Sequence, residues 1–96
     1  MASKSEISWK RRTEDGERVA VYARRVGDQW KFFMRDRRYD QWQAVPEPPL
    51  DDWLELLDAV RRRINRRLLR PEEEARVIKF IYERFPEANI EPPGEY

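Results

Sequence analysis

Basic and aromatic residues recur between positions 10 and 35, and they are the side chains in this sequence best suited to binding a ligand. Lysine and arginine neutralise phosphates, and aromatic rings stack on nucleobases. A sheet face that combines both kinds of side chain therefore suits single-stranded nucleic acid. The strand register derived below places seven such residues on one face: Lys10, Arg12, Tyr22, Arg24, Lys31, Phe33 and Arg35.

The same pattern also has a structural explanation. An antiparallel sheet that is covered on one face presents a polar second face to water. A cross-strand pair such as Tyr22 and Phe33 is ordinary sheet stabilisation, and basic side chains near a sheet edge discourage aggregation. Because this pattern is common, the sequence alone favours the structural explanation, with nucleic-acid binding as the alternative.

A run of six arginines between positions 61 and 70 is the second candidate, and no acidic residue interrupts residues 59–70. On a helical wheel four of them share the solvent side, where they could contact a phosphate backbone or resemble a nuclear import signal: Arg62, Arg63, Arg66 and Arg70. The structural explanation is that cations suit the C-terminal end of a helix. Asp58 also precedes Arg62 by four residues, and acidic residues 72–74 follow. We favour the structural explanation here too.

Phe80 is the third candidate, because it lies opposite the apolar stripe of its predicted helix. It either contacts a partner or is covered by the chain's own C-terminal residues Ile90, Pro92 and Tyr96.

The sequence contains neither histidine nor cysteine, which excludes a serine–histidine triad, thiolate chemistry and the usual zinc ligands. Asp51, Asp52, Glu55 and Asp58 cluster where a helix begins, and capping together with the favourable sign of the helix dipole explains the cluster without a catalytic role. No EF-hand loop or phosphate-binding glycine loop is present. We therefore expect a protein that is not an enzyme and has no cofactor and no metal site.

Two turns define the first half of the chain. A two-residue turn at Asp15 and Gly16 would mix apolar and polar side chains on each face. A three-residue loop of Glu14, Asp15 and Gly16, with Gly16 left-handed in a bulge, avoids this mixing. This loop pairs Trp9 with Val21 and Ile7 with Ala23.

The second turn has two residues, Gly27 and Asp28. It predicts four cross-strand pairs: Ala23 with Phe32, Val21 with Met34, Arg25 with Trp30 and Tyr22 with Phe33.

Both turns assign the same residues to an apolar face: Ile7, Trp9, Val19, Val21, Ala23, Trp30, Phe32 and Met34. This agreement between independent turns predicts a three-stranded antiparallel meander. Residues 42–45 predict a short fourth strand at the edge, and Pro46, Pro48 and Pro49 then prevent further pairing.

Two helices follow the meander. The first is predicted over residues 50–70, and its apolar stripe consists of Trp53, Leu56, Leu57, Val60, Ile64 and Leu68. The second begins at Pro71 and ends at Phe85, with Val77, Ile78, Ile81 and Phe85 on its buried side. We expect both helices to pack on the apolar face of the sheet.

The chain of 96 residues has room for one domain, and its 41% of charged residues are nearly balanced at a net charge of +1. With 12% aromatic residues, this composition predicts a folded chain. The prediction is a single α+β domain over residues 1–86, in which two C-terminal helices cover a three- or four-stranded antiparallel meander, followed by a proline-rich acidic tail over residues 87–96.

The preferred functional hypothesis is a noncatalytic protein-interaction module that binds an unknown protein or self-associates, and the alternative is a nucleic-acid-binding domain. Residues 1–10 lack the apolar stretch of a signal peptide, and no apolar run approaches the ~20 residues that span a bilayer. We expect a cytoplasmic protein without a membrane partner.

Overall fold

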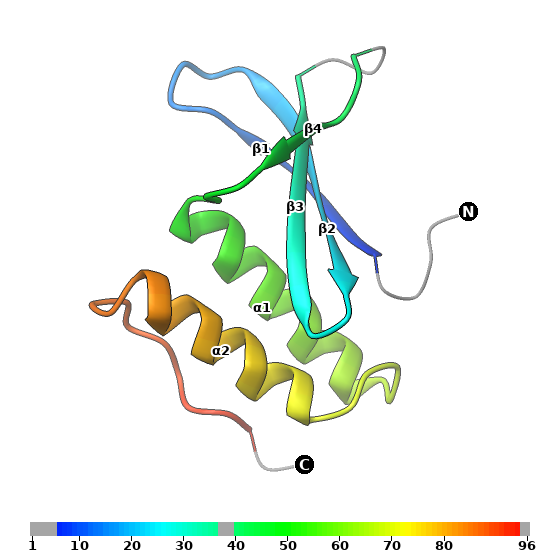
Figure 1. Ribbon diagram of the computed structural model, residues 1–96, viewed down its shortest axis with the longest axis vertical. Helices are drawn as coiled ribbons and strands as arrows, with labels where there is room; N and C mark the ends of the chain where they lie inside the picture. Colours follow the sequence, from blue (N-terminus) through cyan, green and yellow to red (C-terminus); the bar gives the residue numbers. More distant parts are fainter. Residues whose placement is uncertain (1–5, 37–39, 95–96) are drawn as a thin grey trace. The chain divides into compact units, whose positions relative to one another are not determined.

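The computed structural model describes residues 6–36 and 40–94. The chain divides into two compact units, Met1–Pro48 and Pro49–Tyr96, and each unit is described by itself. The first contains a four-stranded antiparallel sheet and the second contains two helices (Figure 1). The predicted α+β class is confirmed.

The sheet is a meander in which every strand pairs with its neighbours in the sequence. Its strands are β1 (Glu6–Arg12), β2 (Arg18–Val26), β3 (Gln29–Arg35) and β4 (Gln43–Val45), in the order β1-β2-β3-β4. The predicted fourth strand is therefore present at the edge, and it is only three residues long.

The loop between β1 and β2 has the predicted three-residue form. The Gly16 N–H donates to the Thr13 carbonyl at 2.9 Å, and the Thr13 N–H donates to the Glu17 carbonyl at 2.8 Å. Gly16 has a φ of +84°, which glycine adopts without steric cost. Glu14, Asp15 and Gly16 thus form a turn that ends in a left-handed bulge.

The turn between β2 and β3 consists of Gly27 and Asp28, because Val26 pairs with Gln29. Gly27 has a positive φ of +65°, whereas the φ of Asp28 is negative. This combination is that of a type II′ hairpin turn. All the predicted cross-strand pairs are confirmed, including Trp9 with Val21 and Tyr22 with Phe33.

The predicted apolar face is the buried one. Six of its members have relative exposures of 8% or less, and these are Ile7, Val19, Val21, Ala23, Trp30 and Phe32. The other two, Trp9 and Met34, are half-buried. The rings of Trp9 and Phe32 meet edge to face at 6.1 Å, so the pleat of the strands has sorted the side chains as the sequence predicts.

The second unit is a helical hairpin, in which α1 (Leu50–Asn65) and α2 (Glu72–Arg84) pack side by side in opposite directions (Figure 1). The N-cap of α1 is Pro49 rather than an aspartate, and Asp51 and Asp52 lie in the first turn, where their charge suits the positive end of the helix. The core of this unit comes from the predicted stripes, and it includes Trp53, Leu56, Leu57, Val60, Ile64, Val77 and Ile81.

The prediction that the first helix continues to residue 70 is wrong, because α1 ends at Asn65. Arg67 adopts a left-handed φ of 60°. Its N–H donates to the Ile64 carbonyl at 2.9 Å, and the Leu68 N–H donates to the Arg63 carbonyl at 2.8 Å. This is a Schellman motif with arginine at the position that glycine usually occupies. Leu68 consequently leaves the apolar stripe and is 61% exposed.

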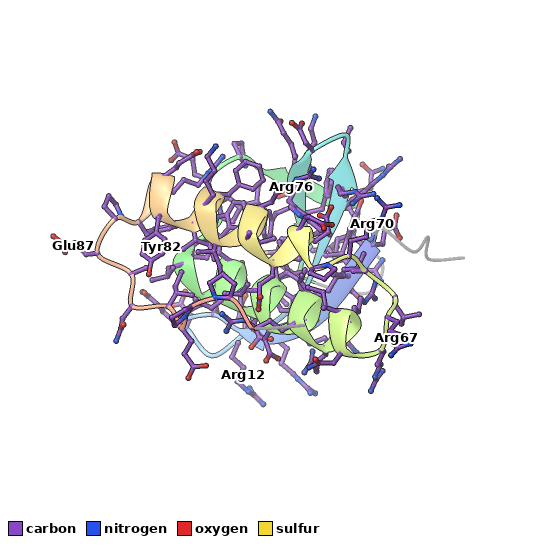
Figure 2. All side chains as sticks on the ribbon, turned by 90° about the horizontal axis from the view of Figure 1, so that it is seen from below. Arg12, Arg67, Arg70, Arg76, Tyr82 and Glu87 are labelled. Atoms are coloured by element: carbon purple, nitrogen blue, oxygen red, sulfur yellow. The ribbon has the colours of Figure 1, made fainter. Side chains whose placement is uncertain are left out.

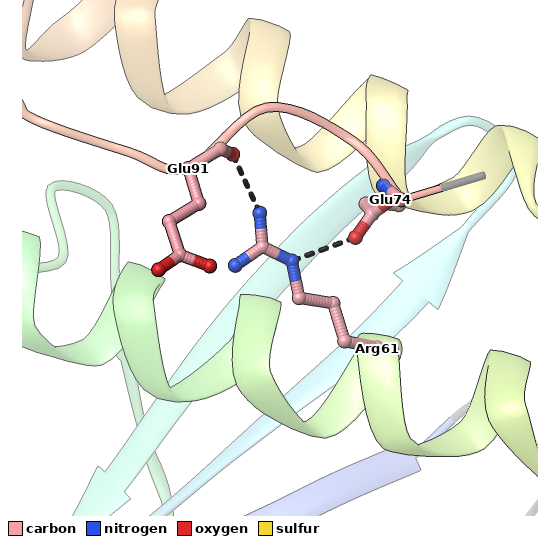
Figure 3. Close-up of polar contacts among 4 residues, drawn as sticks. Arg61, Glu74 and Glu91 are labelled. Atoms are coloured by element: carbon pink, nitrogen blue, oxygen red, sulfur yellow. Dashed lines mark hydrogen bonds and ion pairs between the residues drawn. The ribbon is translucent and has the colours of Figure 1, made fainter.

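A buried carboxylate joins both helices to the residues that follow them (Figure 3). Glu74 of α2 is 1% exposed, and its Oε2 accepts a hydrogen bond from Nε of Arg61 at 2.6 Å. Its Oε1 accepts from the Gly94 N–H at 2.9 Å, while Nη2 of Arg61 donates to the Glu91 carbonyl at 2.7 Å. Residues 91–94 of the predicted tail are therefore fastened to the helical hairpin, as is Ile90, whose N–H donates to the Tyr82 hydroxyl at 3.3 Å.

The left-handed arginine makes a testable prediction. Arg67→Gly removes the steric cost of a side chain at positive φ, so we expect the free energy of unfolding to rise by about 1 kcal/mol. Chemical denaturation followed by circular dichroism measures this change. The matched control is Arg66→Gly, whose φ of −89° needs no glycine. The control should lower stability, and an equal effect of both variants would contradict the assignment of the motif.

The buried carboxylate makes a second prediction. Arg61→Ala removes the guanidinium that donates to the buried Glu74 carboxylate at 2.6 Å, so we expect a loss of about 2–3 kcal/mol in the free energy of unfolding. The matched control is Arg62→Ala, which breaks the exposed pair between Arg62 and Asp58 and should cost less than about 1 kcal/mol. Equal losses in the two variants would show that the buried Arg61–Glu74 pair contributes no more to the free energy of unfolding than the exposed Arg62–Asp58 pair.

Candidate nucleic-acid interface

The exposed face of the sheet brings together the seven residues that the sequence placed there. Tyr22 and Phe33 are directly opposite each other in the centre of this face. On one side of them, Arg24 pairs with Lys31. On the other side, Lys10 and Arg35 both pair with Ala20, and Arg12 pairs with Arg18 one row further along. Rows of cations thus flank a central aromatic row.

The aromatic row contains three rings. The rings of Tyr22 and Phe33 stack at a centroid distance of 4.7 Å with an interplanar angle of 17°. Trp42, which immediately precedes β4, packs edge to face on Tyr22 at 4.7 Å and 85°. Tyr22 and Phe33 are half-buried, and Trp42 is 37% exposed, so the cluster retains aromatic surface that a ligand can reach.

Arg35 links the aromatic row to the cations. Its guanidinium lies 4.4 Å from the centroid of the Trp42 ring, within the range of a cation–π interaction. Because guanidinium binds phosphate through two parallel N–H groups and also stacks on rings, Arg35 is placed to contact a phosphate beside a stacked base.

The charges on this face are of one sign except at one end. Glu6, opposite Arg24, is the acidic residue that the described strands contribute to this face. Lys10, Arg12, Arg24 and Lys31 are exposed, and Nη1 of Arg12 donates to the Gly16 carbonyl at 3.1 Å. The face therefore presents a positive potential around an aromatic centre, although the net charge of the chain is only +1.

The predicted basic helix face does not form as a helix face. Arg62 and Arg63 lie in the last turn of α1, and Arg62 is paired with Asp58 at 2.9 Å, as the sequence indicated. Arg66 is the C-cap residue, and Arg70 lies beyond the helix, since α1 ends five residues before it. The helical wheel placed these four side chains together only because it continued the helix through the Schellman motif.

Phe80 is half-buried against its own unit. Its ring lies 6.4 Å from the buried ring of Trp53 in α1, and the guanidinium of Arg84 lies 5.9 Å from its centroid. Trp53 and Arg84 are therefore neighbours of Phe80 within the helical unit. Cover by Ile90, Pro92 and Tyr96 stays a prediction. Tyr96 lies outside the described residues.

The carboxylates at the start of α1 do not assemble a metal site. No group of three or more histidine, cysteine, aspartate or glutamate residues within 6–36 and 40–94 could hold a metal ion. Over the same ranges, no helix combines the length and apolar character needed to cross a membrane.

Sequence reasoning missed Trp42 and Arg18 as members of the exposed face. Arg18 could have been found, because strand alternation places it opposite Arg12. Trp42 could have been found in the same way, because the predicted strand over residues 42–45 places it on the same face as Ala44, which pairs with Phe33. In the structure β4 begins one residue later than predicted, at Gln43.

No family model, curated protein or solved structure matches this chain. Its function must therefore be argued from its own residues.

Proposed function

We propose that this protein binds single-stranded nucleic acid on the exposed face of its sheet, without catalysing a reaction. The observation that carries the proposal is the cluster of Tyr22, Phe33 and Trp42 with cations on both sides of it. The sequence alone favoured a structural explanation for this face, because a single aromatic pair is common. A third ring and a guanidinium stacked on it favour a ligand that has both bases and phosphates.

The dimensions of the face suit a short stretch of nucleic acid. The cationic rows extend along β2 from Arg18 to Arg24, a distance of about 20 Å at the usual rise per residue of a strand. A few nucleotides can lie along this length, with bases stacked on the central rings and phosphates beside the flanking cations.

A single strand fits this face better than a duplex. Stacking on the Tyr22, Phe33 and Trp42 cluster requires bases whose flat surfaces are free, whereas a duplex buries them in its own stack. The cations alone would bind either form through its phosphates. The aromatic centre therefore favours the single-stranded form.

A noncatalytic protein-interaction module, which the sequence favoured, stays a second prediction. Its specific support is that, within the part of the chain that the structure describes, β1 has a strand neighbour on one side only, in the order β1-β2-β3-β4. Such an edge can pair with a strand of another chain. The basic residues Lys10, Arg11 and Arg12 at one end of β1 weigh against pairing with a second copy. Light scattering across a concentration series measures self-association.

The proposal predicts salt-dependent binding to a labelled single strand in fluorescence anisotropy. If four cations contact phosphates, the affinity should fall about fiftyfold between about 50 and 200 mM salt. Lys31→Gln should make the slope of log affinity against log salt shallower by about 0.7, because one phosphate contact is lost. The matched control is Lys79→Gln, an exposed lysine of α2, which should leave binding unchanged. The absence of binding at low salt would exclude the proposed function.

The aromatic cluster makes a separate prediction. Trp42→Ala should weaken binding to a single strand by about 1–3 kcal/mol, because one stacking surface is lost while the cations remain. The slope of log affinity against log salt should be the same as for the unmodified protein. Tyr82→Phe, at a 38% exposed aromatic residue of α2, is the control and should bind normally. Unchanged affinity in Trp42→Ala would mean that the rings serve only to stabilise the sheet.

A further inference from the structure

The connection between α1 and α2 concentrates cations that form no ion pair within residues 6–36 and 40–94. Arg66, Arg67 and Arg70 are all exposed, and none of them forms an ion pair with another described residue. Neighbouring arginines differ in this respect, because Arg61 is paired with Glu74 and Arg62 with Asp58. We call Arg66, Arg67 and Arg70 the arginine turn; Figure 2 shows Arg67 and Arg70 along this connection.

The backbone of the arginine turn is fixed and sterically unfavourable. The N–H groups of Arg66, Arg67 and Leu68 all donate to carbonyls of the last turn of α1, so three backbone hydrogen bonds hold the start of the connection. Arg67 is the one non-glycine residue with positive φ in the described part of the chain. Glycine would fit this position better, because it adopts positive φ without steric cost. The hydrogen bonds of the Schellman motif come from the backbone, so the arginine side chain adds nothing to them. Strain of this kind is a reason to look for a role outside folding.

From these observations we propose that the arginine turn is a second phosphate-contacting site, which binds the same nucleic-acid strand as the sheet face. This inference rests on the proposed function of the sheet. Guanidinium groups match phosphodiester oxygens with two parallel N–H donors, and three of them on a fixed turn present a dense positive charge. No aromatic residue occurs between residues 61 and 79, so the site would contact the backbone of the nucleic acid and not its bases.

An anionic membrane surface is the competing ligand, and the composition of the turn argues against it. Stable attachment to a bilayer requires a broad apolar face, a lipid chain or a larger cluster of basic residues. The arginine turn has three free cations and one strongly exposed apolar side chain, Leu68, because Leu69 is half-buried. Phosphodiester binding needs only the cations.

The two sites lie in different units of one chain, so occupation of one raises the effective concentration of the strand at the other. A long oligonucleotide should therefore gain affinity from the arginine turn, and an oligonucleotide only long enough for the sheet face should not. Length dependence thus separates the contribution of the turn from that of the sheet.

The experiment uses fluorescence anisotropy of the full chain with labelled oligothymidylates of about 5 and about 20 nucleotides at about 100 mM salt. Arg67→Gly should bind the long probe about fivefold more weakly, and the triple change of Arg66, Arg67 and Arg70 to glutamine about a hundredfold more weakly. Neither variant should change binding of the short probe. Arg67→Lys should lose less affinity than Arg67→Gly, because it retains the charge and loses only the two parallel N–H donors of the guanidinium.

The controls are the single variants Arg62→Gln and Lys79→Gln; each removes one charge, as Arg67→Gly does, and each should leave affinity for the long probe unaltered. Arg67→Gly also excludes misfolding as the cause of weaker binding, because this variant is expected to unfold at a higher denaturant concentration. If the unmodified protein binds both probes and the arginine variants match it, the second site is disproved and the sheet proposal stands. If it binds neither probe, both proposals fail.

A membrane ligand is tested with vesicles in which about a third of the lipid is phosphatidylserine. Binding of the unmodified protein to these vesicles, with loss in the triple variant and no effect of that variant on the long probe, would overturn the assignment to nucleic acid. No binding to the vesicles, together with the expected losses on the long probe, would support it.

Discussion

The sheet depends on two glycines that hold its register. Gly16 and Gly27 both have positive φ, and each closes a turn whose length decides which residues face one another. A shift of one residue at either turn would exchange the two faces of a strand. Such a shift would bury arginine and lysine and would expose residues such as Val21 and Phe32. The large energetic difference between the two arrangements explains why the aromatic and basic residues share one exposed face.

Sequence reasoning succeeded where the signals were local. Alternation of side chains and the chemistry of two short turns were sufficient for the register of β1, β2 and β3, and therefore for seven residues of the exposed face. It failed at the end of α1, since arginine occupies a position where the usual signal is glycine. It also missed Trp42, because alternation along the predicted strand 42–45 gives the face of this residue but does not reveal the contact of its ring with Tyr22. Residues 90–94 are attached to the helical hairpin by single hydrogen bonds to Arg61, Glu74 and Tyr82. These partners are distant in the sequence, and amino-acid composition does not reveal such contacts.

The chain is nearly neutral overall, but its cations differ in whether they form ion pairs. Arg61, Arg62 and Arg76 are paired with carboxylates of the helical unit, and they contribute to its structure. Among the described residues, the cations of the exposed sheet face and of the arginine turn form no ion pair of this kind, so they leave local positive potential. For a chain of this kind, the distribution of ion pairs is a better guide to an anionic partner than the net charge.

The carboxylate of Glu74 also has a consequence for the order in which the chain folds. The sheet unit is built from pairings between adjacent strands, which can form as soon as residue 45 has been synthesised. The helical unit is different, because the partners of Glu74 and Arg61 include Gly94 and Glu91. During translation the hydrogen bonds from Gly94 to Glu74 and from Arg61 to Glu91 form only after these late residues have emerged, so the helical unit completes its polar contacts last.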